Sequence, residues 1–127
     1  MKIVLLIAAE RGIRCLQRFI ELKKNEELIV FTFKERPWEP PFSERINEIC
    51  MREKIDFYCT NKIHDKEYNH VWTILPDLMF SIGWRYLIPK ERYSASRIGS
   101  FVFHDSLLPN YRGFSPTVWA MRNGEVA

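Results

Sequence analysis

His104 and the loop that follows it are the residues of this sequence best suited to chemistry. The histidine ends the apolar run SFVF (100–103), and a loop containing Pro and Gly begins directly after it. An imidazole has an unperturbed pKa of about 6.5 and transfers protons readily at neutral pH. A structural interpretation is also open, in which the ring only binds a backbone carbonyl where the strand ends. The strand pattern alone does not decide between the two interpretations.

The loop at 106–113, SLLPNYRG, contains residues that can hold one shape and contact a ligand. Pro109 fixes its own φ angle, Gly113 permits unusual backbone angles, and Arg112 offers a planar, fork-shaped hydrogen-bond donor. The pair Leu107–Leu108 follows no helix or strand pattern. We therefore expect these two leucines to plug the core or to wall an apolar pocket. Taken together, the loop and the histidine form one candidate site.

Composition indicates one globular domain over residues 1–127, with 46% hydrophobic and 28% charged residues. The formal net charge is +3, from 19 basic and 16 acidic residues that are interleaved along the chain. Without a Lys/Arg block, charge alone does not predict a nucleic-acid partner. A small molecule that carries phosphate is compatible with this charge.

Other features exclude several classes of protein. The longest apolar run, 3–9, is far shorter than the ~20 residues that span a bilayer, and no secretory signal precedes it. Cys15, Cys50 and Cys59 form no C-x-x-C pair, so neither a disulfide framework nor a zinc site is predicted. We therefore expect a cytoplasmic protein without a metal or a membrane partner.

Apolar patterning predicts alternating strands and helices. We expect strands at 2–8, 27–34, 56–59, 78–82 and 100–104, and helices at 13–23, 43–54, 68–75, 89–94 and 116–123. Ser43 is the expected cap of the second helix, and the proline-rich segment 36–42 is expected to be a loop. This order predicts a Rossmann-like α/β fold: a three-layer α-β-α domain with a mostly parallel sheet.

In open α/β sheets, ligands bind beyond the carboxyl ends of the strands, near the point where strand order reverses. This rule selects three segments, which are 9–12, 81–85 and 104–113. The first turn, AAERG, lacks the G-x-G-x-x-G pattern of dinucleotide-binding domains, which disfavours a dehydrogenase. The second and third segments are the stronger candidates for a binding site.

Residues 103–125, FHDSLLPNYRGFSPTVWAMRNGE, preceded by FSIGWRYLIP at 80–89, resemble the N-terminal catalytic domain of the folate-dependent formyltransferases. That family includes methionyl-tRNA formyltransferase, glycinamide ribonucleotide formyltransferase, and enzymes acting on nucleotide-linked amino sugars. The S-L-L-P-x-Y-R-G motif with a histidine two residues upstream is specific, and the order of strands fits over all 127 residues.

The resemblance implies formyl transfer from 10-formyltetrahydrofolate to a primary amine, with His104 in proton transfer. The near-neutral charge favours a nucleotide-linked amino sugar over tRNA as the acceptor. Folate contacts are expected from the strand end at 81–85 and from the loop at 107–113. These residues are Ser81, Ile82, Gly83, Trp84, Arg85, Leu107, Leu108, Pro109, Tyr111, Arg112 and Gly113.

The chain departs from the family pattern at two places. Val102 stands where the family has an asparagine that helps to hold the developing oxyanion, and the family's aspartate would lie beyond Ala127. One alternative is therefore a module that binds folate or nucleotide without turnover, and methionyl-tRNA formyltransferase is another. The domain is also expected to be truncated before its last strands, which would leave residues 101–103 as an apolar edge open to self-association.

Overall fold

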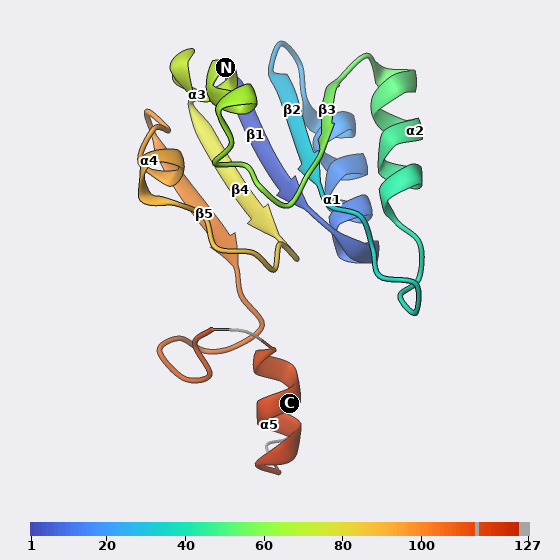
Figure 1. The fold of residues 1–127 in the computed structure, drawn as a ribbon, viewed down its shortest axis with the longest axis vertical. Helices are drawn as coiled ribbons and strands as arrows, with labels where there is room; N and C mark the ends of the chain where they lie inside the picture. Colours follow the sequence, from blue (N-terminus) through green and yellow to red (C-terminus); the bar gives the residue numbers. More distant parts are fainter. Residues whose placement is uncertain (114, 125–127) are drawn as a thin grey trace.

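The structure is a computed structural model that describes residues 1–113 and 115–124, built around a five-stranded parallel sheet (Figure 1). The strands are β1 (Lys2–Ile7), β2 (Glu27–Thr32), β3 (Asp56–Cys59), β4 (Leu78–Ile82) and β5 (Gly99–Phe103). The helices are α1 (Ala9–Leu22), α2 (Ser43–Glu53), the short 3₁₀ helix η1 (Lys66–Tyr68), α3 (Asn69–Thr73), α4 (Lys90–Tyr93) and α5 (Pro116–Arg122). The predicted Rossmann-like α/β fold is confirmed.

The strand order is β3-β2-β1-β4-β5, with every neighbouring pair parallel. The chain builds outward from β1 to β3 and then crosses over to begin again with β4 on the other side of β1. Strand order therefore reverses between β1 and β4, which is where such sheets bind their ligands.

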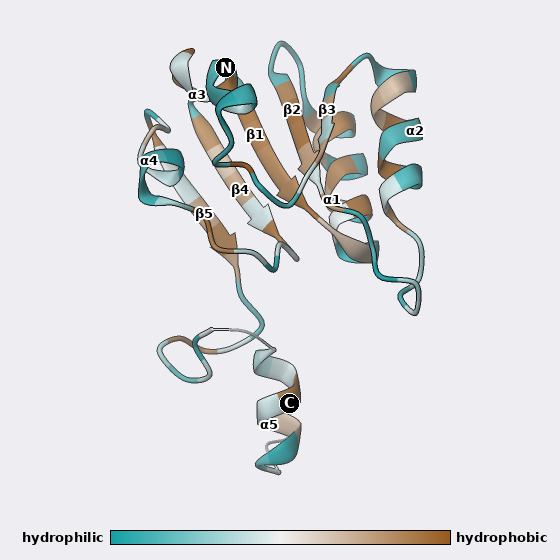
Figure 2. Cartoon of the chain, viewed as in Figure 1, coloured by the Kyte–Doolittle hydropathy of each residue, from teal (hydrophilic) through white to brown (hydrophobic). Residues whose placement is uncertain are grey.

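Successive residues of the central strand β1 pack against opposite layers, as strand geometry requires. Leu5 packs with residues of α1 and α2 in one core, and Val4 and Leu6 pack with Trp72 of α3 in the other. Figure 2 shows hydrophobic residues along β1, β2 and β4, as expected for strands covered on both faces. The predicted three layers are thus present.

The first helix begins earlier than predicted, because Gly12 does not end a turn. Ala9 to Gly12 form the first turn of α1, and Gly12 is buried. A Cβ atom on this glycine would lie 3.0 Å from Cβ of Ile7. The glycine therefore permits close packing of the helix on β1 and does not form a turn before the helix.

The second strand ends at Thr32, two residues earlier than predicted, and the third helix is also shorter than predicted. Leu75, the last residue of the predicted helix, is exposed and has a φ of 52°. It precedes Pro76, whose ring disfavours the helical conformation in the residue before it. The helix therefore ends at Thr73.

Ser43 is the first residue of α2, so it does not cap the helix with its side chain as predicted. The carboxylate of Glu35 performs this function from the preceding loop. It accepts hydrogen bonds from the backbone N–H of Ser43 at 2.9 Å and of Phe42 at 3.3 Å. An acid at the N-terminus of a helix also interacts favourably with the helix dipole.

The strand β5 lies at one edge of the described sheet, and residues 104–113 and 115–124 extend away from it (Figure 1). Phe101, Val102 and Phe103 are all at least half exposed. The exposed apolar edge predicted from the sequence is therefore present. Among the described residues, no helix is long and apolar enough to cross a membrane.

Candidate functional site

A cavity of about 570 Å³ opens at the carboxyl ends of β1, β4 and β5. All three segments selected from the sequence contribute to its wall, together with the loop after β2. The lining residues are Ala9, Arg11, Arg36, Glu39, Ser81, Gly83, Trp84, Arg85, Tyr86, Leu87, Val102, Phe103, His104, Asp105, Gly113, Ser115 and Pro116. The cavity therefore lies at the switch point of the sheet.

His104 follows the last residue of β5 and is half-buried in the wall of this cavity. Its Nε2 lies 3.0 Å from the carbonyl oxygen of Gly113, and its Nδ1 lies 2.8 Å from Oγ of Ser106. The carbonyl can only accept a hydrogen bond, so Nε2 carries a hydrogen in this arrangement. The Ser106 hydroxyl also lies 2.6 Å from the carbonyl oxygen of Asn110, and its single hydrogen can be donated either to this oxygen or to Nδ1. The ring is thus held by the loop and faces the cavity.

An ion pair joins this segment to the first helix. The two terminal guanidinium nitrogens of Arg11, Nη1 and Nη2, donate to the carboxylate of Asp105, and the Nη2–Oδ2 distance is 2.8 Å. The hydrogen bond from Arg11 lowers the pKa of Asp105, and the same contact raises the pKa of Arg11. Both side chains line the cavity, so its rim carries a charged pair at neutral pH.

A second ion pair anchors the loop after β2 to the loop after β4. Arg85 Nη1 lies 2.6 Å from Oε1 of Glu39, and both side chains are largely shielded from solvent. The guanidinium of Arg85 also lies 4.7 Å from the ring centroid of Phe33. Hydrogen bonds from the Arg36 N–H and from Arg85 lower the pKa of Glu39. This corner of the cavity is therefore held by both charge and packing.

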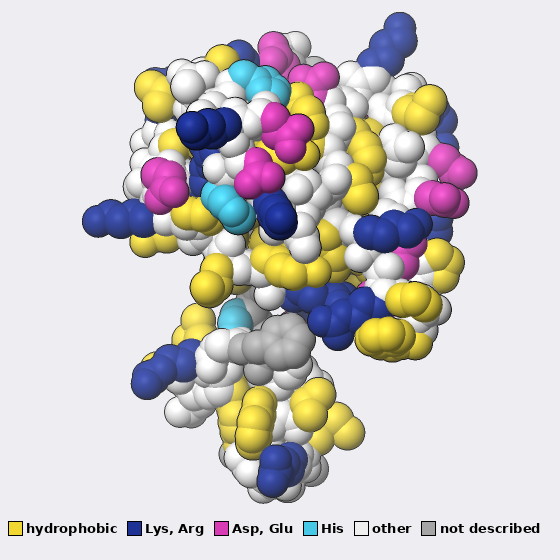
Figure 3. Space-filling model, in the orientation of Figure 1, with side chains coloured by type: hydrophobic (Ala, Val, Ile, Leu, Met, Phe, Trp, Pro, Cys, Tyr) yellow, Lys and Arg dark blue, Asp and Glu magenta, His cyan; other side chains and the backbone are white. Residues whose placement is uncertain are grey.

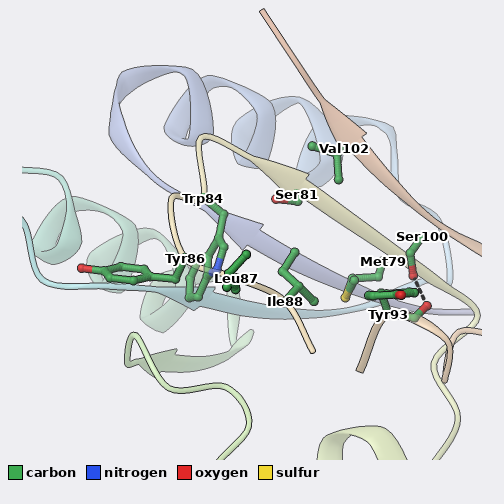
Figure 4. A pocket seen from close by; sticks show the side chains of 9 residues that line it. All are labelled: Met79, Ser81, Trp84, Tyr86, Leu87, Ile88, Tyr93, Ser100 and Val102. Carbon is green, nitrogen blue, oxygen red and sulfur yellow. Dashed lines mark hydrogen bonds between the residues drawn. The ribbon is translucent and has the colours of Figure 1, made fainter. Parts of the chain in front are cut away.

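A smaller cavity of about 360 Å³ lies next to the first, beneath the segment 84–88 (Figure 4). Figure 4 shows Tyr86 and Trp84 at one end of it, and Tyr93 and Ser100 at the other. Its wall consists of Met79, Ser81, Trp84, Tyr86, Leu87, Ile88, Tyr93, Ser100 and Val102. The buried indole N–H of Trp84 has no hydrogen-bond partner within the described part of the chain. The nitrogen itself is buried, so it is the rest of the indole that lines the two cavities.

Ser81 and Val102 lie opposite each other on β4 and β5, and both line both cavities. Ser81 is 3% exposed and Val102 is 62% exposed. Trp84, Tyr86 and Leu87 also belong to both linings. The two cavities therefore share one wall.

The residues predicted from the sequence divide into two groups. Ser81, Gly83, Trp84, Arg85, His104 and Gly113 line the larger cavity. The side chain of Ile82 lies in the core, while Leu107, Leu108, Pro109, Tyr111 and Arg112 line neither cavity.

The two leucines of the loop were expected to plug the core or to wall a pocket, and in this structure they do neither. Leu107 is 88% exposed and Leu108 is 60% exposed. The loop extends away from the sheet, so neither side chain reaches the core (Figure 1). The loop contributes Gly113 and its contacts with His104 to the site.

Sequence reasoning missed Arg36, Glu39, Tyr86 and Leu87. The segment 36–42 was interpreted only as a loop, although β2 is the neighbour of β1 and its loop emerges at the same end of the sheet. That adjacency was the available signal, and it requires the strand order to be known.

The strand order and the cavity at its reversal define a Rossmann-like α/β domain with a cavity at the carboxyl ends of β1, β4 and β5. The chain belongs to the formyl transferase family, whose model matches residues 1–127. The resemblance seen in the sequence is thereby confirmed.

Two curated relatives carry related names. A methionyl-tRNA formyltransferase of Clostridioides difficile (strain 630) is 30% identical over 130 residues, covering 98% of this chain and 41% of that protein. The bifunctional polymyxin resistance protein ArnA of Wigglesworthia glossinidia brevipalpis is 29% identical over 126 residues, covering 98% of this chain and 19% of that protein. The chain thus spans less than half the length of either relative.

Solved structures share the fold. The glycinamide ribonucleotide transformylase 1 of Symbiobacterium toebii superposes with a TM-score of 0.66 at 16% identity, covering 98% of this chain and 60% of that one. The phosphoribosylglycinamide formyltransferase of Anaplasma phagocytophilum gives a TM-score of 0.63 at 17% identity, covering 98% and 59%. At this identity the likeness concerns the fold alone.

Proposed function

We propose that this domain transfers a formyl group from 10-formyltetrahydrofolate to the primary amine of a nucleotide-linked amino sugar. One observation carries the proposal: two cavities of different character share a wall at the end of β4 and β5, beside a histidine. A reaction between a donor and an acceptor requires two such adjoining compartments.

The smaller cavity suits the flat heteroaromatic part of a folate. Met79, Ile88 and Val102 supply apolar walls, and the indole ring of Trp84 supplies an aromatic one. Pockets of a few hundred Å³ with few polar groups are typical of cofactor sites. When bound, the folate supplies the formyl carbon that the amine attacks.

His104 is suited to take the proton that the attacking amine loses. Its Nε2 faces the Gly113 carbonyl in the wall of the larger cavity, on the side where the acceptor would enter. To accept a proton, one ring nitrogen must offer a free lone pair. The Ser106 hydroxyl or the Gly113 carbonyl therefore has to release its contact when the acceptor binds.

A donor of hydrogen bonds is also needed where negative charge develops on the formyl oxygen. Val102 offers none, but the hydroxyl of Ser81 lies across from it on the adjacent strand and lines both cavities. We assign this donor role to Ser81. The assignment explains how a chain with valine at this position retains an oxyanion-stabilising group.

Two alternatives stay distinct from this proposal. A methionyl-tRNA formyltransferase would use the same cavities with tRNA as the acceptor, as the name of the Clostridioides difficile relative indicates for that protein. A module that binds folate or nucleotide without turnover would keep the cavities and lack transfer. The cluster of arginines at the cavity favours a phosphate-bearing acceptor in either case.

The test is a formyl-transfer assay with 10-formyltetrahydrofolate and either UDP- or dTDP-linked amino sugars or methionyl-tRNA, alongside calorimetric titration of a 10-formyl folate analogue. We expect analogue binding and transfer to the sugar amine. His104→Asn should lower kcat by about 100-fold or more with unchanged analogue affinity. The exposed His64 serves as the control in His64→Asn. Binding without transfer would support the non-catalytic module, and absence of binding would refute the proposal.

Self-association through β5 also belongs to this proposal. The strand presents an unpaired edge with exposed apolar side chains, which is a template for pairing with a second strand. We infer that two copies pair through this edge when nothing else covers it.

A further inference from the structure

The segment 36–39, RPWE, forms a tight turn beside the larger cavity. The N–H of Glu39 donates to the carbonyl of Arg36 at 3.0 Å, and the N–H of Arg36 donates back to Oε2 of Glu39 at 2.7 Å. Pro37 occupies the second position of this turn, where proline is favoured, and Trp38 occupies the third. The turn therefore holds the tryptophan at its tip.

This turn is fixed to the rest of the site. Glu39 also accepts from Arg85 at 2.6 Å, so one carboxylate ties the turn to the loop after β4. Arg36 and Glu39 both line the larger cavity, which brings the turn to its rim. A rigid support lowers the entropy cost of binding a ligand there.

Trp38 is 75% exposed, although a tryptophan usually gains stability by burial. The guanidinium of Arg36 lies 5.6 Å from its ring centroid and covers part of the ring. The rest of the ring is open to solvent. An open indole face is a platform on which a flat, aromatic ligand can stack.

The charge next to this platform favours an anion. Arg11, Arg36 and Arg85 line the cavity with two carboxylates, those of Glu39 and Asp105, so one positive charge is in excess. Arg11 and Arg85 are paired with these acids, whereas Arg36 forms no ion pair among the described residues. Figure 3 shows dark-blue basic side chains gathered beside yellow hydrophobic ones on this face, next to the C-terminal segment.

We propose that Trp38 and Arg36 bind the nucleoside diphosphate part of the acceptor. The base stacks on the open face of the Trp38 ring, and the guanidinium of Arg36 binds the phosphates at the cavity rim. This inference rests on the proposed function and specifies its substrate: the amine to be formylated enters the cavity while the nucleotide stays on the turn.

The experiment measures binding without catalysis. UDP, dTDP and inorganic pyrophosphate are titrated into the purified protein by calorimetry. We expect Trp38→Ala to weaken UDP and dTDP binding by about tenfold or more, since a stacked base contributes about 1–3 kcal/mol, and to leave pyrophosphate binding unchanged. Arg36→Gln should weaken all three ligands, and Trp38→Phe should retain most of the affinity.

A matched control lies on α5. Trp119 is also exposed and has the guanidinium of Arg122 at 5.2 Å from its ring centroid. Neither tryptophan lines a cavity itself, but Arg36 lines the larger one, whereas Arg122 lines neither. Trp119→Ala should leave all three affinities unchanged. Equal UDP affinity in Trp38→Ala and the unmodified protein would overturn the inference. So would binding of tRNA with no binding of either nucleotide.

The two proposals fail separately. Nucleotide binding that depends on Trp38, without any formyl transfer, would support this inference and refute the catalytic proposal. Formyl transfer to a nucleotide-linked amine that is equally fast in Trp38→Ala would support the catalytic proposal and refute the role of Trp38 in nucleotide binding.

Discussion

At the scale of single residues, the proposed reaction depends on Ser81, which faces Val102 and would stabilise the developing oxyanion. They are partners in the register of β4 and β5 and line the wall that the two cavities share. Ser81 is almost completely buried, so its hydroxyl acts in a region from which water is largely excluded. Hydrogen bonds in such surroundings are stronger than in water.

We predict that Ser81→Ala lowers kcat by about 100-fold, because a single oxyanion donor contributes roughly that much. The combined variant Ser81→Ala with Val102→Asn should recover a large part of this loss, since asparagine restores a donor on the opposite strand. Steady-state kinetics with saturating donor measure both effects. Ser94→Ala, on an exposed serine outside both cavities, is the control. Full activity in Ser81→Ala would show that another group holds the oxygen.

At the scale of elements, the helix α2 depends on Glu35, whose carboxyl pKa is strongly lowered. Burial of its carboxylate raises the pKa, but hydrogen bonds from Ser43 outweigh this effect and lower it from 4.5 to about 2. A lowered folded-state pKa contributes stability above the unfolded value and loses it as pH falls toward the folded value. The ionised form of Glu35 therefore stabilises α2 at neutral pH.

Glu35→Gln should lower the free energy of unfolding by about 1 kcal/mol at pH 7, the size of a typical helix cap. The difference between the two proteins should remain constant above pH 5 and shrink as the pH falls from 4.5 to about 2. Urea unfolding at several pH values provides the measurement. Glu48→Gln, on an exposed residue of α2, controls for loss of charge. A difference that did not change with pH would contradict the assignment of the cap.

Gly83 fixes the distance between the ends of β1 and β4. Its φ is 77°, and a Cβ there would lie 2.8 Å from the carbonyl oxygen of Ala8. Gly83→Ala should therefore destabilise the domain by more than the roughly 1 kcal/mol of an unfavourable φ alone. Gly99→Ala, where a Cβ meets only the ring of Phe101, should be close to neutral. Thermal unfolding compares the two, and equal midpoints would exclude the close approach.

Local patterns predicted the elements well where burial and spacing agree. The runs that became β1 and β4 were located to within a residue or two, because buried parallel strands are continuous apolar segments. The run that became the exposed edge strand β5 was located equally well. The errors fell where tertiary contacts override local preference. Gly12 was predicted in a turn but packs against β1. Ser43 was predicted to cap α2, but the carboxylate of Glu35 accepts the hydrogen bond at this helix end.

The site was predictable where its residues follow a strand directly. His104 and Gly83 both follow strands whose ends meet at the switch point. Arg36 could not be assigned in the same way, because its place in the wall depends on the turn that Glu39 and Arg85 hold together. Pairs formed by residues about fifty positions apart leave no local pattern.

At the scale of the whole molecule, the self-association proposed above depends on the edge of β5. Phe101 is 50% exposed and stacks on Phe80 at a centroid distance of 5.6 Å. We predict a monomer–dimer equilibrium that depends on protein concentration, measured by analytical ultracentrifugation. Phe101→Lys should shift it toward monomer, because charged side chains on an edge oppose strand pairing. A mass that stays monomeric at all concentrations would exclude pairing through this edge.

The wall shared by the two cavities has a kinetic consequence. Since Ser81, Trp84, Tyr86, Leu87 and Val102 face both compartments, filling one of them changes the surface that the other offers. Two substrates that meet across such a partition are energetically coupled, and each must alter the affinity of the other by the same factor. For the proposed formyl transfer, initial-rate patterns should accordingly follow a sequential scheme, in which the dissociation constant of each substrate depends on whether the other is bound.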